Sequence, residues 1–375
     1  MAPFKSTQSF SVGAFLKTFR SRDAVGPAAL NSPVRTNRIV QFQASGGTKI
    51  DGSDGFTYHI FQKGNTDTFS ITEIATDASD TVEVLLIGGG GGGGKQHGGG
   101  GAAGALYHNP AYPIPAVADY TVTIGAGGAS ETSGSDSVFN DVTMNGGGAG
   151  GRMGNDGTAG GSGGGGGMNN NNPGPGTPVP GGAVTAPPTT PSSSPLLYAN
   201  AGGSGSAYYD YSDGGIGGGG GGAGGAGTSA PPGPGLSDPK GRGGDDYLFT
   251  SIPTAVMPEI AEGLGTPTVL LGVPLDSPEP FKRAYAGGGA GGSHSPWSIY
   301  NPGYTGYGNH PDVEDPMGGG SSYRTGGLGG LGNTEVGDPG VEGRGGGGGG
   351  SGQLPTNGGY GGAGICIVKY ATPAT

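Results

Sequence analysis

Runs of consecutive glycine limit the folds open to this chain more than any other feature. Glycine supplies 94 of the 375 residues, and the first long run is Gly88–Gly94. Fixing the backbone costs about 1–2 kcal/mol per residue, and more for glycine, which has no side chain to bury in return. Ordered tracts must therefore gain main-chain hydrogen bonds from one another. Extended helices of the polyproline II type can form such bonds sideways, because no side chain keeps two glycine tracts apart.

About ten glycine-dominated tracts follow residue 87. They occupy residues 88–94, 98–101, 146–151, 160–167, 214–227, 287–292, 318–320, 326–332, 343–350 and 358–364. Glycine does not recur strictly at every third position, which excludes a collagen triple helix. Six to eight residues in the polyproline II conformation span about 19–25 Å, comparable with an ordinary strand. We expect packed polyglycine helices. Flexible linkers are the alternative, although linkers usually contain serine and separate true domains.

Short apolar runs on both sides of the glycine-rich region predict strands at its base. Residues 56–87 alternate between apolar and polar side chains and end in TVEVLLI, residues 120–124 read YTVTI, and residues 365–370 read ICIVKY. We expect Val82–Ile87 to pair with Ile365–Tyr370. The predicted fold is mostly β and irregular, with short strands at the base, packed polyglycine helices, long loops and little α-helix.

The single cysteine and the lack of long apolar stretches indicate which cellular compartments suit this chain. Cys366 excludes an intrachain disulfide, and its place in ICIVKY predicts a small buried apolar side chain. No secretory signal peptide is visible, and no stretch approaches the roughly 20 apolar residues of a membrane span. We therefore expect neither secretion through a signal peptide nor membrane insertion.

Charge separates residues 1–45, a predicted docking arm, from a glycine-rich domain at residues 46–375. Residues 1–49 hold seven basic residues and one acidic residue, whereas the remainder holds ten basic and 27 acidic residues. The acidic majority disfavours nucleic acid as a partner. Exposed phenylalanines among basic residues indicate docking to another protein. The docking candidates are Phe4, Phe10, Phe15, Phe19, Arg20 and Arg22. A short helix over residues 12–22, folded back onto the domain, is the alternative.

The run VEVLLIGGGGGGGK has the look of a phosphate-binding loop but lacks its essential parts. Gln96 follows Lys95 where Ser or Thr should bind magnesium, and more glycines follow in place of a helix. No nucleotide cofactor is expected.

Histidines and carboxylates form no motif. His59, His97, His108, His294 and His310 lack metal-ligand spacing. No motif fixes a carboxylate pair of the kind that glycosidases use. The loop carboxylates considered are Asp245, Asp246, Asp312, Glu314 and Asp315. We expect neither a metal site nor an enzyme.

Aromatic residues gather in two segments, PWSIYNPGYTGYGNHP at residues 296–311 and AYYDY at residues 207–211. Tyrosine among glycine, serine and asparagine is typical of recognition loops, since a rigid amphipathic ring gives contact area at low entropic cost. The receptor-binding candidates are Trp297, Tyr300, Tyr304, Tyr307, Tyr208, Tyr209 and Tyr211. Alternatively, these rings cover bare glycine helices and shield their hydrogen bonds from water.

Three stretches occur in the order TVEVLLIGGGGGGGKQHGGGGAAGALY, DYTVTIGAGGASETSGSDSVF and GGYGGAGICIVKY. In this order they resemble the glycine-rich domain of phage tail-fibre and virion proteins, over about residues 56–370. The start, MAPFKSTQSFSVGAFLKTFRSRDA, is similar to the N-termini of structural proteins from large cyanobacterial phages (cyanophages). The architecture is similar to the adhesins of T-even-type phages, in which stacked polyglycine helices support variable loops. The insertions at residues 168–213 and 228–286 depart from the compact pattern.

The resemblance implies a bacteriophage virion structural protein, made in the host cytoplasm. On this view it is a fibre or adhesin that attaches by residues 1–45 to other phage structural proteins and presents loops to a host surface glycan or protein. A non-adhesive decoration or stabilising protein of capsid or tail is the alternative, and a glycan-depolymerising spike is the third. Because fibres are commonly trimeric, a homo-oligomer is expected.

Overall fold

The computed structural model describes residues 42–63, 66–74, 81–169, 174–186, 196–209, 215–230, 241–249, 251, 284–292, 325–327, 329, 336–352 and 356–372. Contacts divide the chain into Met1–Val40 and Gln41–Thr375, and all described residues belong to the second unit. The docking candidates Phe4, Phe10, Phe15, Phe19, Arg20 and Arg22 lie outside the described residues. Gln43–Ser45, at the end of the expected arm, form a strand of the second unit.

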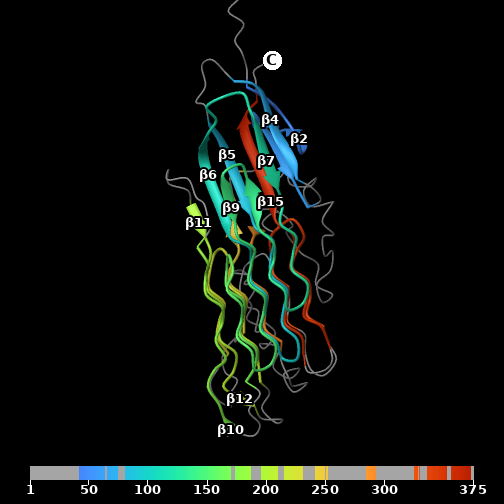
Figure 1. The fold of residues 1–375 in the computed structure, drawn as a ribbon, viewed down its shortest axis with the longest axis vertical. Helices are drawn as coiled ribbons and strands as arrows, with labels where there is room; N and C mark the ends of the chain where they lie inside the picture. Colours follow the sequence, from blue (N-terminus) through green and yellow to red (C-terminus); the bar gives the residue numbers. More distant parts are fainter. Residues whose placement is uncertain are drawn as a thin grey trace, which may run out of the picture. The chain divides into compact units, whose positions relative to one another are not determined.

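Two antiparallel sheets form the base of this unit (Figure 1). The first has the order β1 (Gln43–Ser45), β4 (Asp67–Glu73), β7 (Asp119–Thr123), β8 (Ser137–Phe139) and β9 (Val142–Met144). The second has the order β11 (Leu196–Tyr198), β6 (Leu106–Pro113), β5 (Thr81–Ile87), β15 (Ile365–Ala371), β3 (Phe56–Phe61) and β2 (Thr48–Asp51).

Two short ribbons complete the strands. One pairs β10 (Gly174–Pro175) with β12 (Tyr208–Tyr209), and the other pairs β13 (Tyr247–Leu248) with β14 (Ala284–Tyr285). None of the described segments is helical, so none could cross a bilayer as an apolar helix. The prediction of a mostly β and irregular fold is confirmed.

The last strand of the chain lies in the middle of the six-stranded sheet. Ile367 of β15 is opposite Leu85 of β5 on one side and Ile60 of β3 on the other. The pairing predicted from the two apolar runs is therefore confirmed. Because β15 lies between β5 and β3, the six-stranded sheet cannot be completed until residues 365–371 have joined it.

Alternate residues of the central strands face the five-stranded sheet. Leu86, Cys366 and Val368 are fully buried in one apolar cluster with Phe69 and Phe139. Cys366 is thus a small buried apolar side chain, as predicted, and burial raises the pKa of its thiol. The two sheets share a core built from side chains.

The other face of the six-stranded sheet is also covered. Leu85, Ile87 and Ile365 belong to a second buried cluster, together with Phe249 and Tyr285 from distant segments. A strand buried on both faces needs apolar side chains at nearly every position. This explains why the sequences of β5 and β15 are almost continuously apolar.

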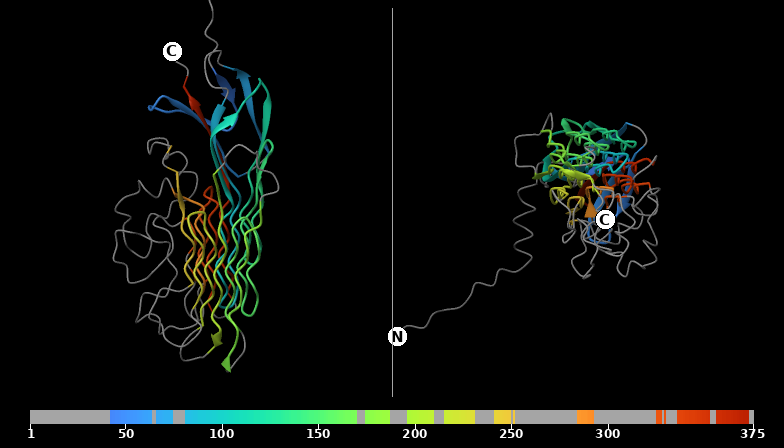
Figure 2. Two further views of the ribbon diagram at one scale, coloured as in Figure 1. Left: turned by 90° about the vertical axis from the view of Figure 1, so that its left-hand side faces the viewer. Right: turned by 90° about the horizontal axis from the view of Figure 1, so that it is seen from below.

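Beyond the strands the chain runs in extended tracts that lie side by side (Figures 1 and 2). β5 continues directly into Gly88–Gly94, whose donors follow a period of three, with N···O distances of 2.8–3.0 Å. Gly88, Gly91 and Gly94 donate to residues 99–105, Gly89 and Gly92 donate to residues 132–135, and Gly90 and Gly93 donate to residues 359–362.

The carbonyl oxygens of the same tract accept from three further segments, residues 147–150, 128–131 and 348–351. The tract therefore bonds to six neighbours through its backbone alone. A three-residue period in the partners is what a helix with three residues per turn produces. The predicted lateral hydrogen bonding is confirmed, and we call this arrangement the glycine lattice.

Close approach of the backbones explains the need for glycine. A Cβ atom on Gly91 would lie 2.2 Å from the carbonyl oxygen of Gly148, and one on Gly90 would lie 2.0 Å from that of Gly346. Real Cβ atoms do not come so near to backbone atoms. Other residue types occur in neighbouring segments, where Thr132 and Ser135 accept hydrogen bonds from the central tract.

Parts of the two insertions also belong to the glycine lattice. Gly202 donates to Gly182 over 3.1 Å, and Gly244 donates to Gly220 over 2.8 Å. The glycine pairs at residues 181–182, 202–203 and 243–244 are too short to stand out as tracts in the sequence. They pack against backbone as closely as the long runs do.

Candidate functional site

The glycine tracts reverse direction in turns at the end remote from the two sheets. We call residues 95–97, 130–131, 152–156 and 351–352, with Thr356, the distal turns. Backbone hydrogen bonds place them at one level, because Met153 donates to Lys95 over 3.2 Å and His97 donates to Gly352 over 3.0 Å. This end of the lattice carries side chains, whereas the tracts that lead to it carry almost none.

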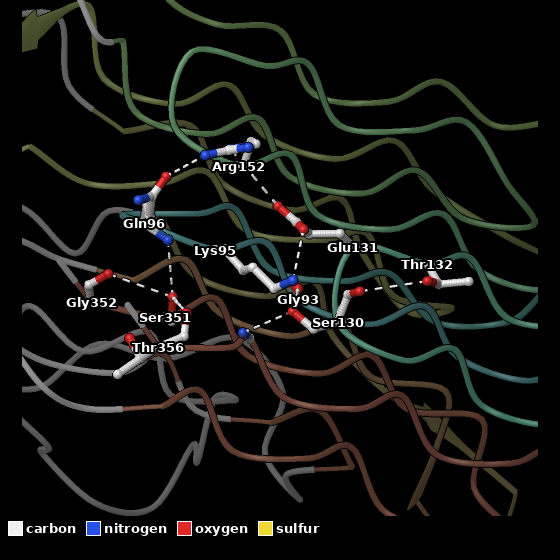
Figure 3. Close-up of polar contacts among 11 residues, drawn as sticks. Gly93, Lys95, Gln96, Ser130, Glu131, Thr132, Arg152, Ser351, Gly352 and Thr356 are labelled. Atoms are coloured by element: carbon white, nitrogen blue, oxygen red, sulfur yellow. Dashed lines mark hydrogen bonds and ion pairs between the residues drawn. The ribbon is translucent and has the colours of Figure 1, made fainter. Parts of the chain in front are cut away.

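Charged side chains link three of the distal turns (Figure 3). Lys95 Nζ lies 3.0 Å from Glu131 Oε2, and Arg152 Nε lies 4.0 Å from Glu131 Oε1. Arg152 also donates a hydrogen bond to the side-chain oxygen of Gln96. The Arg152 side chain is 51% exposed, so solvent screens these ion pairs. They orient the turns more than they stabilise the fold.

A serine joins the fourth turn to the first (Figure 3). The backbone N–H of Gln96 donates to Ser351 Oγ over 3.0 Å, and Ser351 Oγ donates to the carbonyl of Thr356 over 2.9 Å. Ser130 Oγ in turn donates to the carbonyl of Gly93 over 3.1 Å. The distal turns are therefore held together as one surface.

The backbone of the distal turns is locally strained. Gln96, His97 and Glu131 have φ angles of 54°, 55° and 62°, in the left-handed region that side chains disfavour by about 1–2 kcal/mol each. Glycine would avoid this cost, yet these positions carry large polar side chains. Strain of this kind clusters at functional sites, which makes the distal turns the candidate binding surface.

Lys95, which follows the long glycine run, has a place in this surface. It pairs with Glu131, and the chain turns back at Gly98 into another tract instead of starting a helix. His97 beside it is fully buried. Neither the lysine nor its neighbours are arranged as in a phosphate-binding loop.

The aromatic candidates are only partly described. Tyr208 and Tyr209 form β12 opposite Pro175 and Gly174 of β10, and this defines their backbone alone. Trp297, Tyr300, Tyr304, Tyr307 and Tyr211 lie outside the described residues, as do His294, His310, Asp312, Glu314 and Asp315. The receptor-binding role of the aromatic segments stays a prediction.

A second polar cluster lies on the outer face of the six-stranded sheet. Glu83 of β5 is 2.9 Å from His108 Nε2 and 3.0 Å from Lys369 Nζ. Burial alone would raise the pKa of Glu83, but hydrogen bonds from His108 and Lys369 outweigh it and lower that pKa.

This cluster fastens a distant segment to the sheet. The Tyr247 hydroxyl lies 3.3 Å from His108 Nδ1, and Lys369 donates to the carbonyl of Ser251 over 2.8 Å. The Glu83 side chain is only 14% exposed beneath this segment. Glu83 is therefore covered and does not form an open binding site. His108 and Lys369 bond to its carboxylate, which explains how a charged residue fits into the apolar run VEVLLI.

The remaining described histidine and carboxylate candidates have structural contacts. His59 Nδ1 lies 2.7 Å from the carbonyl oxygen of Gly46, and its Nε2 lies 3.0 Å from the Tyr370 hydroxyl. Asp246 accepts a hydrogen bond from Thr325, while the carbonyl of Asp245 accepts one from Gly224. Within the described ranges, no three His, Cys, Asp or Glu side chains come together as a metal site.

Comparison with known proteins identifies the glycine-rich region. The family model described as a glycine-rich domain matches residues 65–371, which include most of both sheets, the glycine lattice and the distal turns. No curated protein matches the chain.

Proposed function

This chain belongs to the glycine-rich domain family, and from that premise we propose that it is a structural protein of a bacteriophage virion. In this proposal, residues 1–45 attach it to other phage structural proteins. The glycine-rich unit projects as a fibre or adhesin, whose distal turns and connecting loops meet the host surface. The chain acts as a homo-oligomer, with three copies as in many fibres.

The observation that carries the proposal is the division of the unit into a backbone-bonded lattice and side-chain-bearing ends. Gly91 donates to Ala102 and accepts from Gly348, so the central tract uses its polar groups to hold itself in place. The polar side chains of Lys95, Gln96 and Arg152 project from the turns where tracts end. An arrangement of this kind suits a protein that presents a polar surface at the end of a rigid backbone scaffold.

Charge and composition support the same proposal. Residues 1–49 carry a net charge of +6 and the remaining residues carry −17, a separation that suits two different contacts. The aromatic segment at residues 296–311 adds rings suited to stacking on sugars, with Trp297, Tyr300, Tyr304 and Tyr307 as the receptor-binding candidates.

Particle incorporation tests the structural part of the proposal. We expect the full chain in purified particles, and we expect a chain lacking residues 1–40, which keeps strand β1, to fold but to stay out of them. Mass spectrometry of particles measures incorporation, and circular dichroism checks the fold of the free proteins. Incorporation of the shortened chain would rule out the docking arm, and absence of the full chain from particles would rule out the virion role.

Binding of purified protein to host cells tests the adhesin part. Replacing Trp297, Tyr300, Tyr304 and Tyr307 with alanine should abolish binding. Tyr360→Ala is the matched control, because Tyr360 is 60% exposed on a glycine tract. Incorporation into particles without binding to cells would favour the non-adhesive decoration role instead. Release of reducing sugar from host polysaccharide would favour a depolymerising spike.

A further inference from the structure

A shallow pocket of about 250 Å³, wide open to solvent, lies beside the distal turns. Its walls come from Gly154 and Asp156 in the third turn, from Asn169 at the end of a glycine tract, and from residues 177–180. These segments are separated in sequence and are brought together by the glycine lattice. The pocket was not visible in the sequence because no motif marks it.

Hydrogen bonds hold the walls of the pocket in place. Asn169 is only 6% exposed, and its Nδ2 donates to the carbonyl of Thr177 over 2.6 Å. Gly154 donates to Met168 over 2.7 Å, and Gly157 donates to Pro180 over 3.0 Å. A ligand would enter a preformed site, so binding would not have to order these segments.

Glycine at position 176 leaves the space that the amide of Asn169 occupies. A Cβ atom on Gly176 would lie 2.2 Å from Asn169 Nδ2. Gly176 itself donates to the carbonyl of Ala207 over 2.8 Å, so its backbone cannot easily withdraw. The same close packing that forms the lattice therefore shapes this pocket.

The lining is mostly polar, and proline rings add a smaller apolar part. The Asp156 carboxylate can accept bonds from two hydroxyl groups, and the Thr177 hydroxyl can donate or accept. Pro178 and Pro180 add C–H surface. A pyranose ring has this combination, with hydroxyl groups around its edge and C–H groups on its faces.

Size and charge narrow the class of ligand. A volume of about 250 Å³ is below the roughly 300–1,000 Å³ of sites for drug-sized molecules and suits a single sugar ring. The carboxylate of Asp156 repels an anionic sugar. We propose that this pocket binds one neutral hexose unit of a surface glycan, an inference that rests on the proposed adhesin function for the source of that glycan.

Direct binding to the full chain tests this inference. The probes are the methyl glycosides of glucose, galactose and mannose, with N-acetylneuraminic acid as the anionic counterpart, and binding is measured by saturation-transfer NMR and calorimetry. At least one neutral glycoside should bind. Asp156→Asn should weaken it about tenfold, because a hydrogen bond to a charged group is lost. Thr177→Val should weaken it less. Asp119→Asn, the same change on β7, should leave it unaltered.

These outcomes distinguish a failure of the sugar-binding inference from a failure of the proposed virion function. No binding of any neutral glycoside, stronger binding of the anionic sugar, or equal affinity of the wild type and Asp156→Asn would overturn the sugar site. In that case, particle incorporation and cell binding that are unaffected by Asp156→Asn would leave the virion role standing. Sugar binding by a protein that is absent from particles would instead leave the pocket and overturn the virion role.

Discussion

The two sheets and the glycine lattice both have tightly packed interiors, but different chemical groups stabilise them. Between the sheets, side chains such as Phe69, Leu86 and Val368 exclude water. In the lattice, Gly91 has no side chain and lies among the backbones of its neighbours. The first region gains stability mainly from apolar burial, at about 25 cal/mol per Å². The second gains it from hydrogen bonds worth about 0.5–1.5 kcal/mol each.

This difference determines which positions of the chain tolerate amino-acid substitution and which do not. A core of side chains can often be repacked with other apolar residues of similar volume. A core of backbones has no room for a methyl group at positions such as Gly91, although it buries the methyl groups of Ala102 and Ala149 at others. Variation in chemistry must therefore be placed in the distal turns and connecting segments, such as those that carry Lys95 and Asp156. The lattice fixes their positions without taking part in their chemistry.

The largest expected effect comes from adding one methyl group at the centre of the lattice. Gly91→Ala should prevent folding or lower the free energy of unfolding by more than about 3 kcal/mol, because its Cβ meets the backbone of Gly148 at 2.2 Å. Chemical denaturation measures the loss.

Gly225→Ala is the matched control for this change. The nearest atom to its Cβ is the Asp245 Oδ2 atom, at 3.1 Å, which belongs to a side chain that can move aside. Its free energy of unfolding should change by less than about 1 kcal/mol. Equal effects of the two substitutions would show that backbone contact is not what the lattice depends on.

In the sheet region, the corresponding change is removal of a buried ring. Phe69 is fully buried and packs edge-on to Phe61 with ring centroids 6.4 Å apart. Phe69→Ala should lower the free energy of unfolding by about 3–5 kcal/mol. Phe69→Leu should restore much of it, since volume is what this core requires. A Leu variant as unstable as the Ala variant would contradict a core held by apolar packing.

A smaller effect is expected from pH at the sheet end. Burial lowers the pKa of His59 below its ordinary value of 6.5, despite the opposing effect of the hydrogen bond from its Nδ1 to the Gly46 carbonyl. The unfolded chain then takes up a proton before the folded one does. Stability should fall as the pH drops below about 6.5, by about 1.4 kcal/mol per pH unit until the folded pKa is reached.

His59→Asn can keep the bond to the Gly46 carbonyl but does not titrate. The fall in thermal stability between neutral and mildly acidic pH should therefore be shallower in this variant than in the wild type. Identical pH profiles would show that His59 is not the group responsible.

The smallest effect is expected at the distal turns. Lys95→Ala removes an ion pair whose lysine is 37% exposed, so the free energy of unfolding should change by less than about 1 kcal/mol. Denaturation curves of the two proteins should nearly coincide. A loss as large as that of Phe69→Ala would mean that the turns stabilise the lattice instead of being positioned by it.

Much of this architecture could be predicted from the sequence because two signals were strong. The apolar runs of β5 and β15 indicated buried strands and their pairing. The entropy of 94 glycines required lateral hydrogen bonds. Strand β6 was not predicted, since Pro110 and Pro113 argue against a strand. Its ladder is irregular between Val82 and Val84, opposite the stretch that contains Pro110.

The arrangement of the tracts could not be predicted. Glycine carries no side-chain pattern, so nothing in Gly88–Gly94 specifies which six segments surround it. Pairs such as those at residues 181–182 and 202–203 also gave no signal. The distal turns depend on these pairings, and for this reason the contact of Lys95 with Glu131 and the pocket at Asp156 emerged only from the structure.

Amide hydrogen exchange tests the central claim most directly. In the lattice, the N–H groups of Gly88–Gly94 are bonded to neighbouring segments at 2.8–3.0 Å. They should therefore exchange as slowly as the amides of β5, which lie in the middle of the six-stranded sheet. Exchange of these glycine amides at the rate of an unstructured chain, while β5 stays protected, would contradict an ordered lattice.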